Sequence, residues 1–140
     1  MTIKEIQEEI IDEFFMFEDW MERYEYIIDL GKSLPLIDEQ FKIDENLIMG
    51  CQSKVWLHSE IENDHLKFTA DSDAILTKGI VAILLRVFNN QKPADILNAD
   101  LYFIDKIGLK EHLSPTRANG LVSMIKQIKL YALAFQSKLS

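Results

Sequence analysis

The stretch that decides the fold is residues 55–70, which reads VWLHSEIENDHLKFTA. Its first eight residues alternate between two faces, and one face carries Val55, Leu57, Ser59 and Ile61. Asn63 and Asp64 tolerate a positive φ, and the alternation resumes at Leu66 and continues to Ala70. The stretch therefore predicts an antiparallel β-hairpin with one buried face.

The segment just before the hairpin favours a further strand. Residues 47–49 are short and apolar, and they are followed directly by Gly50 and Cys51. We expect them to add a third strand, so that tight turns join a small antiparallel sheet of about three strands.

Helical periodicity precedes the sheet. The first segment has apolar residues three or four positions apart, namely Ile3, Ile6, Ile10, Phe14 and Phe17. A second helix carries Trp20 and Tyr24 on one side, and we expect it to end with Gly31 in a left-handed conformation. Residues 33–46 are predicted to be a connecting loop.

Helical periodicity also follows the sheet. Residues 74–89 are apolar almost all round, which predicts a central buried helix with N-cap side chains from Asp71, Ser72 and Asp73. Two short helices are expected from Pro93 and Asp100, and a last helix is expected after Ser114 and a first-turn proline. The predicted class is α+β, with helices packed on one face of the small sheet in a single domain of residues 1–140.

The charge of the chain is −8, and it is unevenly distributed. Residues 1–25 hold nine acidic and two basic side chains, a net charge of −7. The sign argues against nucleic-acid binding, since such proteins must neutralise phosphates. We expect the acidic side chains of residues 1–25 chiefly to face solvent. The more specific alternative is that they contact a basic patch on a partner protein.

Targeting signals are not evident in the sequence. The longest stretch without a polar or charged side chain, residues 79–85, falls far short of a membrane span, and the N-terminus resembles neither a secretory signal nor a presequence. We therefore expect a cytoplasmic protein without a membrane partner.

Cys51 is the only cysteine, which excludes an internal disulfide and a cluster held by several thiolates. The histidines His58, His65 and His112 lack metal-ligand spacing, so no metal and no cofactor is expected. Gly50 permits a sharp bend that would present Cys51 at a loop tip. Residues 46–59 contain one charged side chain, Lys54, so no carboxylate of that stretch opposes a thiolate.

The run at residues 48–56, IMGCQSKVW, resembles the signature of the SufE-like family of cysteine desulfuration proteins. Three further segments resemble that family in order and spacing: an early helix with DW, RY and LGK at residues 19–32, the start of a central helix with ADSDA and KG at residues 70–79, and LSPTRANG at residues 113–120. The similarity covers nearly the whole chain.

The resemblance implies the fold of the IscU-type iron–sulfur scaffold proteins and a role as sulfur acceptor. A pyridoxal-phosphate cysteine desulfurase would hold sulfur as a persulfide, and Cys51 would take the terminal sulfur and relay it to an iron–sulfur cluster scaffold. Such a protein is a sulfur carrier and desulfurase activator by transpersulfuration rather than a stand-alone enzyme. Because exposed thiols oxidise, we expect Cys51 to be sheltered in the free protein and turned outward on docking.

Supporting roles are expected around Cys51 for Gly50, Gln52, Ser53, Lys54 and Arg117. Arg117 could direct positive charge toward Cys51 if the last helix begins beside the loop, although an ordinary surface ion pair or cap explains it equally well.

Two other functions are open from the sequence. The protein could be a non-catalytic binding module that only activates the desulfurase, with Cys51 incidental. A thiol peroxidase or cysteine hydrolase is disfavoured, because the chain has no resolving cysteine and no convincing histidine–acid partner.

Overall fold

The computed structural model describes residues 1–51 and 53–139. The α-helices are α1 (Ile3–Phe15), α2 (Trp20–Leu30), α3 (Ile75–Phe88), α4 (Pro93–Leu97), α5 (Phe103–Lys106) and α6 (Pro115–Leu139). The two strands are β1 (Val55–Glu62) and β2 (His65–Ser72), and short 3₁₀ turns η1 (Gly31–Ser33), η2 (Glu39–Phe41), η3 (Asp44–Asn46) and η4 (Lys110–His112) lie in the connections. This arrangement confirms the α+β class.

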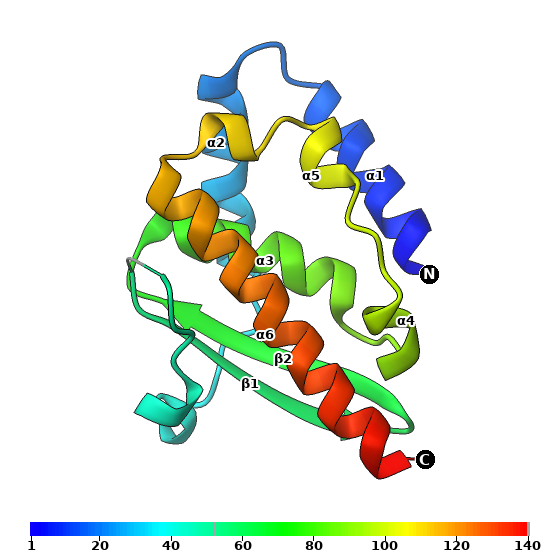
Figure 1. The fold of residues 1–140 in the computed structure, drawn as a ribbon. Helices are drawn as coiled ribbons and strands as arrows, with labels where there is room; N and C mark the ends of the chain where they lie inside the picture. The colour runs from blue at the N-terminus through cyan, green and yellow to red at the C-terminus, as the bar shows by residue number, and fades with distance from the viewer. Residues whose placement is uncertain (52, 140) are drawn as a thin grey trace.

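The predicted hairpin is confirmed, with its turn and its faces. Asn63 and Asp64 adopt φ values of 53° and 64°, and Leu57 pairs with Ala70 across the two strands. Most inward residues are buried, namely Val55, Leu57, Leu66, Phe68 and Ala70, whereas Ser59 and Ile61 near the turn are only partly buried. In Figure 1, α6 passes in front of the hairpin and α3 lies beside it. The Tyr131 hydroxyl of α6 donates a hydrogen bond to the Leu57 carbonyl.

The predicted third strand is wrong, because the sheet of the described residues has two strands. Leu47 forms a single bridge with Trp56, and the Ile48 amide donates to the Val55 carbonyl at 2.9 Å. Directly afterwards Gly50 adopts a φ of 92°, which turns the chain away from the sheet. One bridge therefore forms where we expected a ladder.

The first helix begins with a capping box and ends at Phe15, so the last residue of the predicted stripe, Phe17, lies beyond the helix and is only partly buried. The Thr2 hydroxyl accepts from the Glu5 amide, and the Glu5 carboxylate accepts from the Thr2 amide. The inward residues are buried, namely Ile3, Ile6, Ile10 and Phe14.

The prediction for Gly31 is wrong, because its φ of −59° is right-handed and the chain continues into η1. Position 31 needs a residue without a side chain for another reason, because α2 and α3 approach each other closely there. A Cβ at Gly31 would lie 3.1 Å from the Gly79 amide nitrogen, and a Cβ at Gly79 would lie 2.1 Å from the Ile27 carbonyl oxygen. These two glycines bring the helix backbones together.

The last helix α6 begins as predicted, since the Ser114 hydroxyl accepts a hydrogen bond from the Arg117 amide at 3.3 Å. Its inward face is buried at Leu121, Ile128 and Ala132. In Figure 1 this helix runs diagonally across the front of the molecule. None of the helices in the described part of the chain has the length and hydropathy needed to cross a membrane.

Candidate functional site

Cys51 lies in the segment between Ile48 and β1, which we call the Cys51 loop (residues 49–54). The Ile48–Val55 hydrogen bond closes its base, and the positive φ of Gly50 makes its turn. Gly50 also lies against α6, since a Cβ added there would stand 2.6 Å from the Ser123 Oγ. The backbone angle favours glycine at this position, and a larger residue would also displace the Ser123 hydroxyl.

The Cys51 side chain is half-buried and faces α6. Its thiol donates to the Gly120 carbonyl, with 3.8 Å between Sγ and oxygen. A Cβ at Gly120 would lie 3.6 Å from the Cys51 Sγ, so helix and thiol are close to contact. The thiol is sheltered in this structure, in agreement with the prediction for the free protein.

A cavity of about 10 Å³ adjoins the thiol. Its walls come from the Cys51 loop, α3 and α6, through Cys51, Ser53, Thr77, Ile80, Thr116, Arg117, Gly120 and Met124. A volume of this size is at the lower limit for one water molecule.

Burial raises the pKa of the Cys51 thiol above its ordinary value. The neutral sequence around Cys51 had suggested an unhindered thiolate. In the structure, burial instead favours the neutral form of the sheltered thiol, so opening of the loop would favour ionisation.

Asp73 holds the far end of the Cys51 loop. Its Oδ1 accepts from the Lys54 amide at 3.0 Å, and its own amide donates to the Lys54 carbonyl at 3.2 Å. We call this pair of hydrogen bonds the Asp73 clasp. It ties the loop to the corner between β2 and α3.

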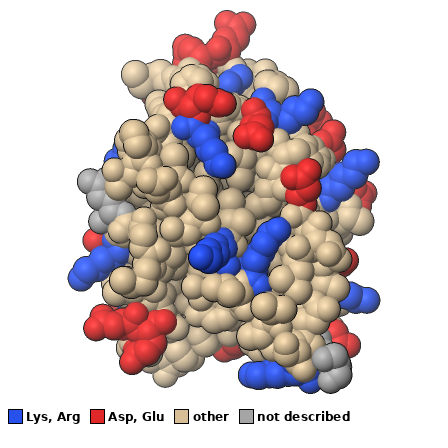
Figure 2. Space-filling model, viewed as in Figure 1, with Lys and Arg blue, Asp and Glu red and all other residues tan. Residues whose placement is uncertain are grey.

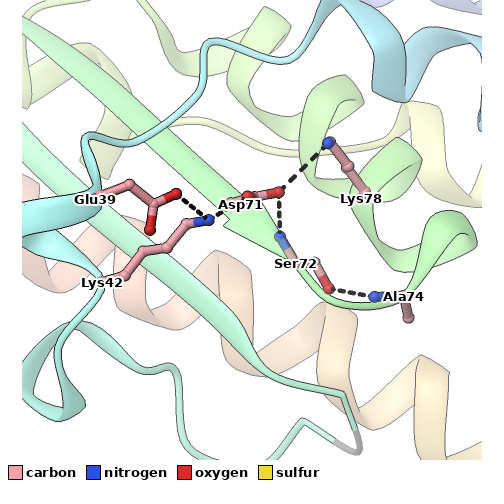
Figure 3. Close-up of polar contacts among 6 residues, drawn as sticks. All are labelled: Glu39, Lys42, Asp71, Ser72, Ala74 and Lys78. Atoms are coloured by element: carbon pink, nitrogen blue, oxygen red, sulfur yellow. Dashed lines mark hydrogen bonds and ion pairs between the residues drawn. The ribbon is translucent and has the colours of Figure 1, made fainter.

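Asp71 binds two lysines at the same corner. Its carboxylate lies 2.8 Å from the Lys42 Nζ and 3.4 Å from the Lys78 Nζ, while Lys42 also contacts Glu39 (Figure 3). Burial raises the pKa of Asp71, but the hydrogen bonds from Lys42 and the Ser72 amide and the charge of Lys78 lower it more, and the net direction is downward.

The predicted capping of α3 is therefore wrong for both aspartates. The N-cap residue is Ala74, and no side chain makes a capping hydrogen bond there. Ser72 instead accepts from the Ala74 amide at 3.3 Å, and Figure 3 shows the Asp71 carboxylate directed toward Lys42 and Lys78. The lysine charges and the Lys54 amide hold the two carboxylates away from the helix end.

The structure brings Ser53 and Arg117 together with Cys51 around the cavity, next to Gly50. Arg117 is exposed, while Lys54 is exposed and joins the site through its backbone. Gln52 lies outside the described residues.

Three contacts of the site escaped sequence reasoning: Gly120, Ser123 and the Asp73 clasp. A glycine in the second turn of a long helix is a signal of close approach and could have indicated Gly120. Ser123 and the clasp are tertiary contacts that no local pattern encodes.

Histidines do not line the cavity among the residues that the structure describes. His58 stacks on Phe41 and lies 3.1 Å from Glu60, and His112 stacks on Trp20. Within the same described ranges, no three His, Cys, Asp or Glu side chains are grouped as metal ligands.

Comparison with known proteins places this chain in a family. The family model of the SufE Fe-S metabolism associated domain matches residues 8–132. The chain belongs to the SufE family. This agrees with the resemblance of the segments around Cys51, the central helix and the last helix.

Members of the SufE family in rhizobia are close in sequence to this chain. An uncharacterized SufE-like protein of Rhizobium etli is 43% identical over 127 residues, covering 87% of this chain and 86% of that protein. A second, from Rhizobium meliloti, is 45% identical over 127 residues, with 87% of this chain and 91% of that protein covered.

A solved structure supports the SufE-family chain's fold. The solution structure of a hypothetical protein from Thermus thermophilus matches with a TM-score of 0.78 at 15% identity, covering 94% of this chain and 96% of that one. At this identity the match shows the fold alone. The comparison with the IscU-type scaffold fold stays a prediction.

Proposed function

We propose that the protein is a sulfur acceptor that takes persulfide sulfur from a pyridoxal-phosphate cysteine desulfurase onto Cys51. It stimulates the desulfurase and relays the sulfur to an iron–sulfur cluster scaffold, as a single cytoplasmic SufE-like domain of residues 1–140. The observation that carries the proposal is a lone cysteine held on a turn, with its thiol in a small cavity. Membership of a family associated with Fe–S metabolism supports it.

The chemistry is an exchange between a thiol and a persulfide. The Cys51 thiolate attacks the terminal sulfur of the desulfurase's cysteine persulfide, and a new S–S bond forms on Cys51. The S–S bond of the donor breaks, and the donor cysteine leaves as a thiolate that takes up a proton. The Cys51 proton passes to solvent or to that leaving thiolate, and no external oxidant or reductant is needed.

The closed site does not accommodate the product. A sulfur atom is larger than a water molecule, and a cavity of about 10 Å³ is barely large enough for water. The Cys51 side chain must therefore turn out of the cavity to receive sulfur. Movement of Cys51 away from the Gly120 carbonyl would also restore hydration and lower the thiol pKa.

Arg117 is positioned to assist the open thiolate. It lines the Cys51 cavity and is exposed, so its guanidinium can approach an outward-turned sulfur. A positive charge near a thiolate favours ionisation. Ser53 and Lys54 would then shape the surface that meets the donor.

Mass spectrometry of the intact protein tests the proposal. After incubation with a cysteine desulfurase and cysteine, the wild-type protein should gain one reducible sulfur atom on Cys51. The Cys51→Ser variant should gain none, and omission of cysteine should abolish the gain. Absence of any sulfur adduct on wild-type Cys51 would contradict the proposal.

The same variant separates the alternative function. A non-catalytic module that only activates the desulfurase would leave Cys51 incidental, and Cys51→Ser would stimulate sulfide release as well as wild type. For an acceptor, we expect the variant to bind the desulfurase without stimulating it.

A further inference from the structure

The solvent side of α6 is unusually apolar for an outer helix. Three large side chains expose about half of their surface: Val122 at 49%, Leu130 at 48% and Leu133 at 52%. Their spacing of eight and three residues places them with the exposed Lys126 on one helical stripe. We call this stripe the α6 outer face; it lies opposite the buried stripe that includes Leu121 and Ile128.

A surface helix normally presents polar residues to water, and exposed apolar patches with a polar rim mark interaction sites. Burial inside this chain does not explain Val122, Leu130 and Leu133, since all three are exposed. The stripe is therefore a candidate interface.

The charge of α6 is opposite to that of the whole chain. Its residues include four basic side chains, Arg117, Lys126, Lys129 and Lys138, and no acidic one, while the chain carries −8. Figure 2 shows basic side chains over the middle of this face, with acidic side chains toward its edges. The surface is thus complementary to one that is both acidic and apolar.

The α6 outer face is continuous with the Cys51 site. The first turns of α6 line the cavity through Thr116, Arg117 and Gly120, and Ser123 lies against Gly50. Val122 follows within the same turns. A protein that reaches Cys51 from solvent would therefore meet this end of the helix.

A second copy of the chain is a poor occupant. A symmetric dimer through this face would bring the Lys126 side chains and the other α6 cations of both copies together, with no acidic residue of α6 to pair with them. Like charges placed across an interface oppose association. The observations favour a different protein.

We propose that the α6 outer face is the docking surface for the cysteine desulfurase, which contacts it through an acidic and apolar surface. The inference rests on the proposed function, and it names residues that contribute to binding of the desulfurase rather than to sulfur transfer. In the complex, Leu130 and Leu133 become buried against apolar side chains of the desulfurase. Lys126 pairs with an acidic group of the desulfurase, which orients the two proteins and makes binding weaker at high salt.

The test measures binding and sulfur loading separately. Full-length Leu130→Ser and Lys126→Glu variants are titrated against each cysteine desulfurase of the source organism, and Met16→Ser is the control. Met16 is 78% exposed and lies at the turn after α1, outside α6. We expect at least a tenfold weaker Kd for both α6 variants with the desulfurase that loads Cys51, and no change for Met16→Ser.

Loading of Cys51 distinguishes failure of this inference from failure of the proposed function. At saturating concentration the α6 variants should load Cys51 to the wild-type extent, and Lys126→Glu should have a weaker salt dependence than wild type. Unchanged Kd values with normal loading would overturn the docking surface and leave the acceptor function intact. A wild-type dimer in light scattering that Leu130→Ser dissociates would assign the face to a second copy and would also overturn the inference.

Discussion

Gly50 is a residue of the Cys51 loop that tolerates substitution poorly. Its φ of 92° is unfavourable for any L side chain, and a Cβ would lie 2.6 Å from the Ser123 Oγ. We expect Gly50→Ala to lower the free energy of unfolding by about 1–2 kcal/mol from the backbone angle alone. The displaced loop should also make Cys51 react faster with iodoacetamide.

A double variant separates the two causes. Ser123→Ala removes the hydroxyl that the new Cβ would meet, so Gly50→Ala with Ser123→Ala should recover part of the lost stability but not the cost of the backbone angle. Chemical denaturation measures both variants. Wild-type stability and wild-type alkylation in Gly50→Ala would show that the loop does not depend on this turn.

Cys51 should ionise late in the free protein. Its pKa is raised by burial, so the neutral thiol is favoured until the pH exceeds the ordinary value of a cysteine. We expect the pH profile of alkylation to inflect at higher pH in the folded protein than in a peptide of residues 46–56. An inflection at or below that of the peptide would mean that the thiol is not desolvated in solution.

At the scale of elements, the corner between β2 and α3 controls the loop through the Asp73 clasp. Asp73→Ala removes the acceptor of the Lys54 amide hydrogen bond. A net contribution of about 1 kcal/mol for that bond corresponds to roughly a fivefold larger open population. Alkylation of Cys51 in the folded protein should accelerate by that factor.

The control for the clasp is Glu62→Ala, which removes an exposed acidic residue at the opposite end of the hairpin. Its alkylation rate should equal that of wild type. Equal rates in Asp73→Ala and Glu62→Ala would place control of the loop elsewhere, at its contact with α6.

The crossing of α2 and α3 depends on glycines that have no role in the site. Alanine is the better helix former by about 1 kcal/mol, so Gly79→Ala would stabilise an isolated helix. In the protein its Cβ would lie 2.1 Å from the Ile27 carbonyl oxygen, which forces the helices apart. We expect a net loss of about 2–4 kcal/mol in urea denaturation, which is in the range for severe overpacking.

Gly31→Ala provides a graded comparison, because its Cβ would approach the Gly79 amide nitrogen only to 3.1 Å. Its loss should be clearly smaller than that of Gly79→Ala. Equal losses would show that the contact with Ile27 does not set the distance between the helices.

At the scale of the whole molecule, the sequence predicted the elements that local patterns of apolar and capping residues determine. The alternation around Leu57 and Leu66 gave the hairpin, and Ser114 with Pro115 gave the start of α6. For Arg117 the sequence left two readings equal, a charge directed toward Cys51 and an ordinary surface ion pair or cap, and in the structure Arg117 lines the same cavity as Cys51.

The predictions that failed concern residues whose roles depend on contacts between distant segments. Asp73 has the chemistry of a helix cap, but the Lys54 amide, nineteen residues away, accommodates its carboxylate instead. Gly31 has the chemistry of a left-handed helix end, but its small size serves the approach to Gly79. In each case the residue type suited a local role at a helix end, but in the folded protein it makes a tertiary contact instead.

The acidic N-terminal segment contributes to stability through Glu13, which joins three helices. Arg86 of α3 binds its carboxylate with two hydrogen bonds of 2.8 and 2.5 Å, and the Tyr26 hydroxyl of α2 also donates to it. The hydrogen bond from Arg86 is the main cause of the lowered pKa of Glu13, and burial followed by the bond to Glu13 raises the pKa of Tyr26 to about 12. Asp12 is an exposed acid on the same helix and serves as a control.

We expect these shifts to narrow the pH range of stability at both ends. Because the pKa of Glu13 is lowered in the folded protein, its contribution is complete above the ordinary value of 4.5 and is lost as the pH falls through the folded value. Because the pKa of Tyr26 is raised, its contribution to stability is complete below pH 10 and is lost as the pH rises toward about 12.

Glu13→Gln should reduce the free energy of unfolding by about 1 kcal/mol at pH 7 and flatten the decline in stability below pH 4.5, whereas Asp12→Asn should reproduce the wild-type profile. Urea denaturation from pH 3 to 11 measures these profiles, and an acid decline as steep in Glu13→Gln as in wild type would assign acid sensitivity to other carboxylates, with Asp71 the next to test.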